Sequence, residues 1–414
     1  MPIKPCSKLW TDLNIFVHRK EIVNCCKRHQ RHKPTIEEFK TLGADYWAFR
    51  PEVTEDKKHF VDINDFPLGC KECAMHHPAS RYSTHNGWNE KTDQFFGALP
   101  TKDYITNIEL SLSSTCNMTC MYCIPEVSSQ WAKKLKVPEN TVDVEWRDAM
   151  LESLFAYIEK EVIYRDKVEY TFLGGEPLLE PMFLEILEKI VALHAKTKKM
   201  PKVRFVTNGN VGPSVMDKFI RLTNSYPNVK WEVAMSIESI GQRAEIIREG
   251  LDFNRFETNF IKMLETDHVY VGILPTFNAL SVYGLLDFHK WMAEKFVKYR
   301  GMEKFGKAWT VHLNLLYQPR EISLGILPEE MKSYVDETIE WVSEMLSVLP
   351  DSKEKDKTRY ILQLENMKKL IGEHRHNTKV MKKSKEWFVQ QGTIHNRDYW
   401  KLLPEMQKIF DDVE

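Results

Sequence analysis

Three cysteines near residue 120 are the residues whose types and spacing point most directly to chemistry. The run Cys116-Asn-Met-Thr-Cys120-Met-Tyr-Cys123 brings three thiols into one short segment. Thiolates bind the irons of iron–sulfur clusters, and a four-iron cluster has four irons to ligate. Because no cysteine follows Cys123 in the sequence, this segment would leave one iron open. An open position distinguishes a catalytic metal site from a closed structural one, as it does for zinc.

A zinc site or a buried group of thiols is the alternative interpretation of these three cysteines. Structural zinc usually takes four protein ligands, and they commonly come in pairs. The spacing from Cys116 to Cys123 does not supply two pairs. The sequence therefore favours a cluster with an open iron.

The elements that must position this segment alternate between strands and helices. Residues 105–112 alternate apolar and polar side chains, which predicts a strand that ends just before the cysteines. Further strands are expected at 168–173, 202–206, 229–237, 268–275 and 309–316, with helices at 144–163, 181–196, 213–225, 253–265 and 279–299. Repeated strand–helix units imply a parallel sheet with right-handed crossovers. About six such units would make an α/β fold of the partial (β/α)6 barrel type.

Two more polar turns are expected at the same edge of this sheet. Gly174-Gly175-Glu176-Pro177 follows one predicted strand, and Thr207-Asn208-Gly209 follows the next. Active sites of parallel α/β barrels lie at the carboxyl ends of their strands. A glycine-rich turn alone is weak evidence, since such turns end many strands. The cysteine segment and these two turns would lie at one edge of the sheet, which packing alone does not readily explain.

Composition and charge narrow the class of protein. The chain has 414 residues, 43% of them apolar and 28% charged, which suits two or three globular domains. No stretch reaches the length of a membrane helix, and no apolar run follows the N-terminal Met1-Pro-Ile-Lys. We therefore expect a cytoplasmic protein that does not bind membranes. A net charge of -1 argues against nucleic acid as the main partner.

The cysteine segment, with Tyr122 just before its last cysteine, resembles the radical S-adenosylmethionine (SAM) superfamily. The resemblance extends over residues 104–320, because further landmarks of that family recur in order. It implies that the open iron of a 4Fe-4S cluster chelates the amino and carboxylate groups of SAM. Electron transfer then cleaves SAM to methionine and a 5'-deoxyadenosyl radical, which abstracts a hydrogen atom from the substrate. Cys116, Cys120 and Cys123 would be the catalytic cluster ligands.

The same resemblance implies the residues that contact SAM. Tyr122 would lie beside the adenine, while Gly174, Gly175 and Glu176 would face the methionine ammonium, a charge-assisted pairing. Ser236 and Glu238 match positions that contact the ribose hydroxyls or the methionyl group. The remaining implied contacts are Thr207 and Asn208 of the second turn, Leu274 on the adenine face, and an arginine on the SAM carboxylate, for which Arg248 is preferred to Arg243.

A second group of cysteines precedes the predicted barrel: Cys6, Cys25, Cys26, Cys70 and Cys73. In a reducing compartment such cysteines indicate metal ligation. They resemble the half-SPASM, or twitch, module that carries an auxiliary cluster in many radical SAM enzymes. Lys20 replaces its usual turn glycine, in a predicted hairpin around residues 18–20, and here the module precedes the barrel.

We expect the ligands of a second, auxiliary 4Fe-4S cluster to be Cys6, Cys25, Cys70 and Cys73, with Cys26 as a substitute. A structural zinc site remains open for these residues. The expected domains are a Cys-rich module over 1–100, a radical SAM core over 101–320 and a helical C-terminal region over 321–414.

The function expected from the sequence is radical SAM catalysis on a peptide or a small molecule. A cellular reductant such as flavodoxin or ferredoxin would be a partner. One alternative is modification of a nucleic acid or nucleotide by the same chemistry, to which the near-neutral charge lends little support. The other is an iron–sulfur or zinc binding protein without turnover.

Overall fold

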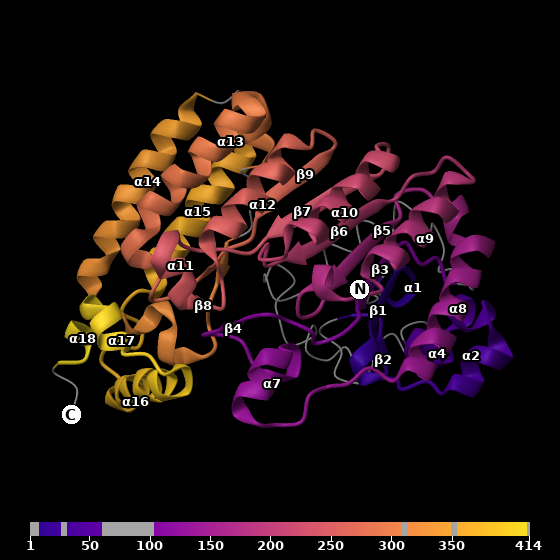
Figure 1. Ribbon diagram of the computed structural model, residues 1–414, viewed down its shortest axis with the longest axis horizontal. Helices are drawn as coiled ribbons and strands as arrows, with labels where there is room; N and C mark the ends of the chain where they lie inside the picture. Colours follow the sequence, from indigo (N-terminus) through magenta and orange to yellow (C-terminus); the bar gives the residue numbers. More distant parts are fainter. Residues whose placement is uncertain (1–7, 26–30, 60–102, 309–312, 349–353, 412–414) are drawn as a thin grey trace. The chain divides into compact units, whose positions relative to one another are not determined.

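The computed structural model describes residues 8–25, 31–59, 103–308, 313–348 and 354–411 (Figure 1). Its contacts divide the chain into two compact units. Unit 1 comprises residues 1–114, 140–205 and 222–231, and unit 2 comprises residues 115–139, 206–221 and 232–414. Each unit is described by itself below.

The main sheet has seven strands in the order β2-β1-β3-β5-β6-β7-β9. Their bounds are β1 Asp12–Phe16, β2 Glu21–Val23, β3 Asn107–Ser111, β5 Glu169–Leu173, β6 Lys202–Thr207, β7 Lys230–Met235 and β9 Val269–Ile273. β1, β3, β5 and β6 are parallel neighbours, and β2 is antiparallel to β1. The predicted α/β class with a parallel sheet is confirmed.

The N-terminal hairpin of unit 1 joins this sheet directly. β1 pairs with β3 in register from Asp12 opposite Asn107 to Phe16 opposite Ser111. A 3-10 turn over Val17–Arg19 connects β1 to β2, and Lys20 closes it in the left-handed conformation (φ 53°). Lysine thus occupies the backbone conformation for which a turn glycine is usually chosen.

Helices α8 and α9 of unit 1 bury apolar residues, and α9 packs against the sheet. α8 (Val144–Lys160) begins at Asp143, whose side chain accepts a hydrogen bond from the Trp146 amide. α9 (Phe183–Ala195) buries Phe183, which contacts Phe172 of β5 and Phe205 of β6 edge to face. Such aromatic pairs add to the stabilisation that burial of apolar area provides.

A buried ion pair joins the N-terminal helices of unit 1 to the segment before β3. The helices are α1 (Lys8–Thr11), α2 (Ile36–Leu42), α3 (Asp45–Phe49) and α4 (Pro51–Lys58). Arg50, between α3 and α4, is 1% exposed and donates to the Asp103 carboxylate at 2.7 Å. It also donates to the carbonyls of Asp12 and Leu9. The Arg50 guanidinium therefore donates hydrogen bonds to α1, to β1 and to the segment before β3.

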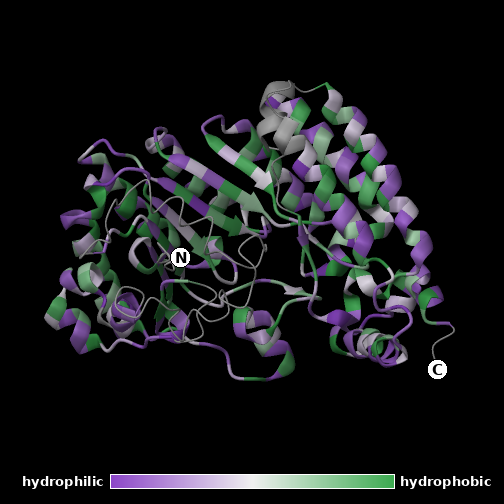
Figure 2. Cartoon of the chain, turned by 180° about the vertical axis from the view of Figure 1, so that it is seen from behind, coloured by the Kyte–Doolittle hydropathy of each residue, from purple (hydrophilic) through white to green (hydrophobic). Residues whose placement is uncertain are grey.

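Unit 2 combines the ends of β6 and β7 with β9 and a large set of helices. The helices whose residues start in this unit are α7 (Ser129–Leu135), α10 (Pro213–Ser225), α11 (Gly241–Ile247), α12 (Phe253–Glu265), α13 (Leu285–Ala308), α14 (Lys332–Ser347), α15 (Glu354–Leu370), α16 (Thr378–His395), α17 (Tyr399–Leu402) and α18 (Pro404–Ile409). In Figure 2 the helices of the C-terminal region carry both green and purple residues, as helices with one buried side do. The expected helical C-terminal region is confirmed.

Two small sheets accompany these helices. β10 (Thr276–Phe277) pairs in parallel with β11 (Asn314–Leu315), and β4 (Thr119–Cys120) pairs antiparallel with β8 (Arg248–Glu249). The strand expected at 309–316 is thus shorter where it is described, and it pairs with β10 rather than in the main sheet. None of the helices described here has the length and apolarity to cross a bilayer.

Candidate active site

The segment that carries the three cysteines is held by a short antiparallel ladder in unit 2. Cys120 of β4 lies directly opposite Arg248 of β8, and Thr119 lies opposite Glu249. The Met121 amide continues the pairing by donating to the Ile247 carbonyl at 2.9 Å. The Cys123 amide donates back to the Cys120 carbonyl at 2.9 Å, which turns the chain between these two cysteines.

Helix α7 supports the same segment from its C-terminal side. Ser128 caps α7 by accepting from the Trp131 amide, and its hydroxyl donates to the Met118 carbonyl at 2.8 Å. The Ser129 hydroxyl lies 3.1 Å from the Cys116 amide and 3.2 Å from its carbonyl. The buried Trp131 indole donates to the Cys120 carbonyl at 2.9 Å.

Sequence reasoning missed α7, although one signal for it was present. A serine directly before a short run of helix-compatible residues is a typical helix N-terminus. Ser128 and the following Ser129-Gln-Trp131 carry that signal.

Nitrogen donors approach two of the three thiols. Arg248 Nη1 lies 3.9 Å from Cys120 Sγ, and Asn208 Nδ2 lies 4.0 Å from Cys116 Sγ. Burial raises the pKa of the Cys120 thiol, although the Arg248 charge opposes this and the Cys123 and Cys116 thiols add to it. Burial raises the pKa of Cys123 as well. Metal ligation must therefore displace protons from these thiols.

Three thiols spread along one short segment can bind a four-iron cluster. Within the described ranges, no three His, Cys, Asp or Glu side chains converge closely enough to hold one ion. A four-iron cluster takes each thiolate on a different iron, so its ligands need not converge on one point. Hydrogen bonds to cluster sulfurs adjust the reduction potential. The donors from Arg248 and Asn208 are placed for that role.

A buried ion pair with a tyrosine hydroxyl against it lies beside Cys120. Arg248 donates to the Glu238 carboxylate from Nη2 at 2.7 Å and from Nε at 3.1 Å. The Tyr122 hydroxyl lies 3.2 Å from both carboxylate oxygens. Glu238 is 0% exposed and Arg248 is 5% exposed. We name Tyr122, Glu238 and Arg248 the buried triad.

Within the buried triad, the charges of Glu238 and Arg248 stabilise each other. Burial alone would lower the pKa of Arg248, but the Glu238 carboxylate raises it above its ordinary value. Burial also raises the pKa of Tyr122, so its hydroxyl keeps the proton that it donates to Glu238. Two residues expected to contact SAM separately, Glu238 and Arg248, are paired with each other in this structure. Arg243 instead contacts Glu405 of α18 and the Leu280 carbonyl.

The Thr207-Asn208-Gly209 turn connects to the cysteine segment through asparagine side chains. Asn208 donates to Asn117 Oδ1 at 2.8 Å and accepts from the Asn210 amide at 2.8 Å. Asn117 in turn donates to the Asn210 carbonyl at 2.7 Å. Gly209 has φ 67°, and a Cβ there would lie 2.5 Å from Met235 Cε. Only glycine fits this position without displacing its neighbours.

Two more predicted contacts lie at neighbouring strand ends of unit 2. The Ser236 amide donates to the Thr207 carbonyl at 2.8 Å, and the Leu274 amide donates to the Met235 carbonyl at 2.8 Å. Ser236 and Leu274 are both half-buried. The carboxyl ends of β6, β7 and β9 thus carry Thr207, Ser236 and Leu274 in adjacent positions.

The Gly174-Gly175-Glu176 turn belongs to unit 1. The Gly175 amide donates to the Ser113 carbonyl at 3.2 Å. Gly174 adopts φ 135°, and an ideal Cβ there would lie 2.8 Å from the Ser113 carbonyl oxygen, which excludes a side chain. The Glu176 carboxylate is buried and accepts from the Leu178 amide at 3.1 Å, which caps a 3-10 turn. The turn is therefore held by backbone hydrogen bonds and has no room for a side chain at Gly174. Its contact with SAM stays a prediction.

The N-terminal metal site also stays a prediction. Cys25 is half-buried and lies two residues after the end of β2. The other expected ligands, Cys6, Cys70 and Cys73, and the substitute Cys26 lie outside the described residues.

Parts of the chain are similar to known proteins. Residues 110–265 match the Radical SAM superfamily. A protein named GTP 3',8-cyclase from Streptomyces coelicolor is 34% identical over 104 residues, which cover 25% of this chain and 26% of that protein. A protein named Molybdenum cofactor biosynthesis protein 1 from Dictyostelium discoideum is 22% identical over 57% of this chain and 34% of its own length. The chain thus matches about a quarter to a third of the length of these curated relatives.

A solved structure of the histidine-tagged protein anSMEcpe with bound AdoMet is similar over 57% of this chain and 60% of its own. Its TM-score is 0.38 and its sequence identity is 22%. The sequence match over 110–265, which contains the three cysteines and most of the predicted SAM contacts, decides the class. Residues 110–265 of the chain therefore form a radical SAM domain.

Proposed function

We propose that this chain reductively cleaves SAM and uses the resulting 5'-deoxyadenosyl radical to abstract a hydrogen atom from a substrate. The observation that carries the proposal is the pairing of Cys120 with Arg248 in the β4–β8 ladder, beside the buried Glu238. This arrangement combines a cysteine ligand and a fixed cation in one buried region inside a radical SAM domain.

Cys116, Cys120 and Cys123 would hold a 4Fe-4S cluster, which when bound supplies the electron for SAM cleavage. Arg248 orients the Cys120 side of the segment, because its guanidinium contacts both the Glu238 carboxylate and the Cys120 sulfur. Asn208 does the same for Cys116 through its amide. Tyr122, fixed by its hydrogen bond to Glu238, offers an aromatic face for the adenine.

SAM itself would be held by groups at the strand ends. Ser236 and Leu274 are half-buried and therefore available to a ligand.

The substrate proposed from the sequence is a peptide or a small molecule. A nucleotide is the second candidate, and a specific observation favours it: curated relatives that match this chain are named GTP 3',8-cyclase. The N-terminal cysteines would add an auxiliary 4Fe-4S cluster or a structural zinc ion near the start of the chain. Flavodoxin or ferredoxin would serve as the reductant.

Anaerobic turnover tests the proposal and separates the two substrate classes. The reconstituted chain would be incubated with dithionite and SAM, with and without GTP, and 5'-deoxyadenosine would be quantified by mass spectrometry. Formation of 5'-deoxyadenosine without substrate supports the cleavage activity. A faster rate with GTP, together with a product derived from GTP, would favour the nucleotide class. Absence of 5'-deoxyadenosine under all conditions would contradict the proposed function.

A further inference from the structure

Exposed basic and apolar residues lie on helix α7 and on the residues that flank it in the chain, next to the cysteine segment. We define the α7 surface as Ile124, Lys133, Lys134, Leu135, Lys136 and Val137, all in unit 2. The apolar members are 52% (Ile124), 40% (Leu135) and 42% (Val137) exposed, and the three lysines are exposed as well. Exposed apolar residues with charged residues beside them are candidates for an interaction site.

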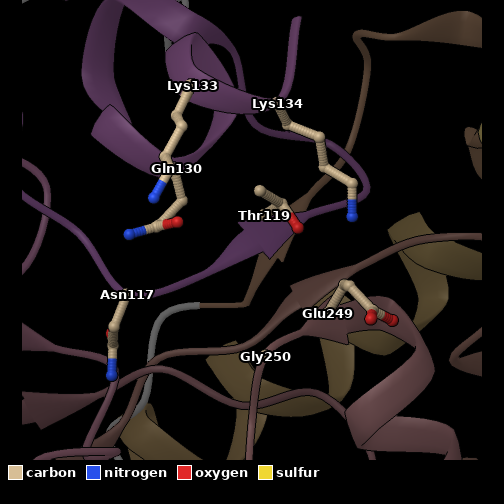
Figure 3. Close-up of a pocket in the computed structure, with 7 residues that line it drawn as sticks. All are labelled: Asn117, Thr119, Gln130, Lys133, Lys134, Glu249 and Gly250. Carbon is tan, nitrogen blue, oxygen red and sulfur yellow. The ribbon is translucent and has the colours of Figure 1, made fainter. Parts of the chain in front are cut away.

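A pocket of about 450 Å³ opens beside this surface. Its lining residues are Asn117, Thr119, Gln130, Lys133, Lys134, Glu249 and Gly250. Figure 3 shows Lys133 and Lys134 on α7 extending toward Thr119 of β4, with Glu249 on the facing strand. The pocket therefore lies along β4, the strand that contains Cys120.

The positive charge of the α7 surface is largely uncompensated. Among the residues that the structure describes, Lys133 and Lys136 take part in no ion pair, and Lys134 Nζ contacts His395 Nδ1 at 2.8 Å. The carboxylate that lines the pocket, Glu249, is paired with Arg397 at 3.0 Å. Glu126, outside the surface, flanks it on the cysteine side. Lys133 and Lys136 are therefore the lysines of this surface that are available to pair with a negatively charged partner.

The α7 surface is also close to the cluster ligands through the chain. Ile124 directly follows Cys123, which is itself half-buried. On the inner side of α7, the Trp131 indole donates to the Cys120 carbonyl at 2.9 Å. A partner seated on α7 would therefore be separated from the cysteine segment by one short helix and one turn.

We propose that the α7 surface docks an acidic one-electron donor protein of the flavodoxin type. This inference rests on the proposed function, because SAM cleavage consumes one electron. The sulfonium of SAM gains that electron, its C5'–S bond breaks, and methionine and the 5'-deoxyadenosyl radical form, while the donor is oxidised by one electron. Electron-transfer encounters use small interfaces in which complementary charge sets the association rate. Lys133 and Lys136, which take part in no described ion pair and lie within four residues of the exposed Leu135 and Val137, fit such an encounter.

A charge-reversal pair tests the docking. The test variant is Lys133→Glu/Lys136→Glu, whose side chains make no ion pair within the described part of the chain. The control variant is Lys290→Glu/Lys298→Glu on α13, which changes the net charge equally on a helix drawn well away from α7 (Figure 1). Affinity for an acidic flavodoxin would be measured by calorimetry at low and at high salt. SAM cleavage would be driven in parallel by reduced flavodoxin and by dithionite.

The expected result is that the test variant binds flavodoxin about tenfold more weakly at low salt, with a smaller loss at high salt. Its flavodoxin-driven cleavage falls by a similar factor, while dithionite-driven cleavage and the control variant stay at the wild-type level. Equal binding by the test and control variants would overturn the proposal. So would a loss of dithionite-driven cleavage in the test variant alone. If the wild type fails to cleave SAM with dithionite, the proposed function fails, and calorimetry still decides the docking.

Discussion

The charges of Glu238 and Arg248 are compensated by each other, because both side chains are shielded from solvent. Both are buried, and the carboxylate receives donors from the guanidinium and from the Tyr122 hydroxyl. Removing one partner of a buried ion pair leaves the other charge uncompensated, at a cost of about 3–5 kcal/mol. Removing a neutral donor costs only about 1 kcal/mol.

We therefore predict that Glu238→Gln lowers the free energy of unfolding by about 3–5 kcal/mol. Tyr122→Phe, which removes one donor to the same carboxylate, should lower it by about 1 kcal/mol. Urea denaturation of the wild type and both variants measures the difference. Equal small losses for the two variants would show that Glu238 and Arg248 are not coupled in the folded protein.

The triad also shows what sequence reasoning could and could not provide at this scale. Tyr122, Glu238 and Arg248 were each predicted as a SAM contact from their place in a motif. Their mutual pairing was not predicted, because 116 positions separate Tyr122 from Glu238 and no local pattern reports such a contact. The cysteine spacing, by contrast, is local and is evident directly from Cys116 to Cys123.

At the scale of elements, periodicity predicted most of the regular structure. The helices expected at 213–225 and 253–265 have these bounds in the structure as well. The strand pair β4–β8 was not predicted, since each strand has only two residues and the pairing is long-range. The position of β11 in a separate two-stranded sheet was missed for a similar reason.

For the N-terminal helices, the buried contacts of Arg50 allow a prediction about stability. Arg50→Met would remove a guanidinium from the Asp103 carboxylate, whose side chain is 0% exposed, and leave Lys57 paired with it. It would also take a donor from the carbonyls of Asp12 and Leu9. Because Lys57 still compensates Asp103, the loss comes mainly from the two carbonyls left without their donor. Each costs about 1–3 kcal/mol, so we expect a loss of at least about 2 kcal/mol in the free energy of unfolding.

Lys58→Met on the exposed end of α4 is the matched control for Arg50→Met. Lys58 pairs with the exposed Glu55, three residues earlier, and surface pairs contribute little. Chemical denaturation followed by tryptophan fluorescence would compare the two variants. A loss for Arg50→Met no larger than that for Lys58→Met would contradict the assigned role of Arg50.

At the scale of the whole molecule, buried histidine makes stability depend on pH. His289 of α13 donates from Nδ1 to the Leu285 carbonyl at 2.6 Å, and its Nε2 accepts from the Tyr360 hydroxyl of α15 at 2.8 Å. Burial lowers the pKa of His289 to about 4. The unfolded chain, with an ordinary histidine pKa near 6.5, binds the proton first as the pH falls.

The contribution of His289 is therefore complete above about pH 6.5 and is lost as the pH falls toward 4. We predict that protonation removes about 3 kcal/mol of stability over this interval. The double variant His289→Leu/Tyr360→Phe, which replaces both polar partners by apolar groups, should lack this part of the pH dependence. Denaturation of wild type and variant at about pH 7, 5.5 and 4 would compare the two slopes. Identical slopes would show that His289 does not titrate as described.

The most direct test of the central claim is the iron content and SAM cleavage of the wild type against a Cys116→Ala/Cys120→Ala/Cys123→Ala variant. Both proteins would be reconstituted anaerobically, and iron, sulfide and zinc would be measured before dithionite and SAM are added. We predict that the variant loses about four irons per chain and all formation of 5'-deoxyadenosine. Iron that remains after this loss would belong to the N-terminal cysteines, and zinc in its place would make that site structural. Unchanged iron in the variant, with no 5'-deoxyadenosine from the wild type, would contradict the account.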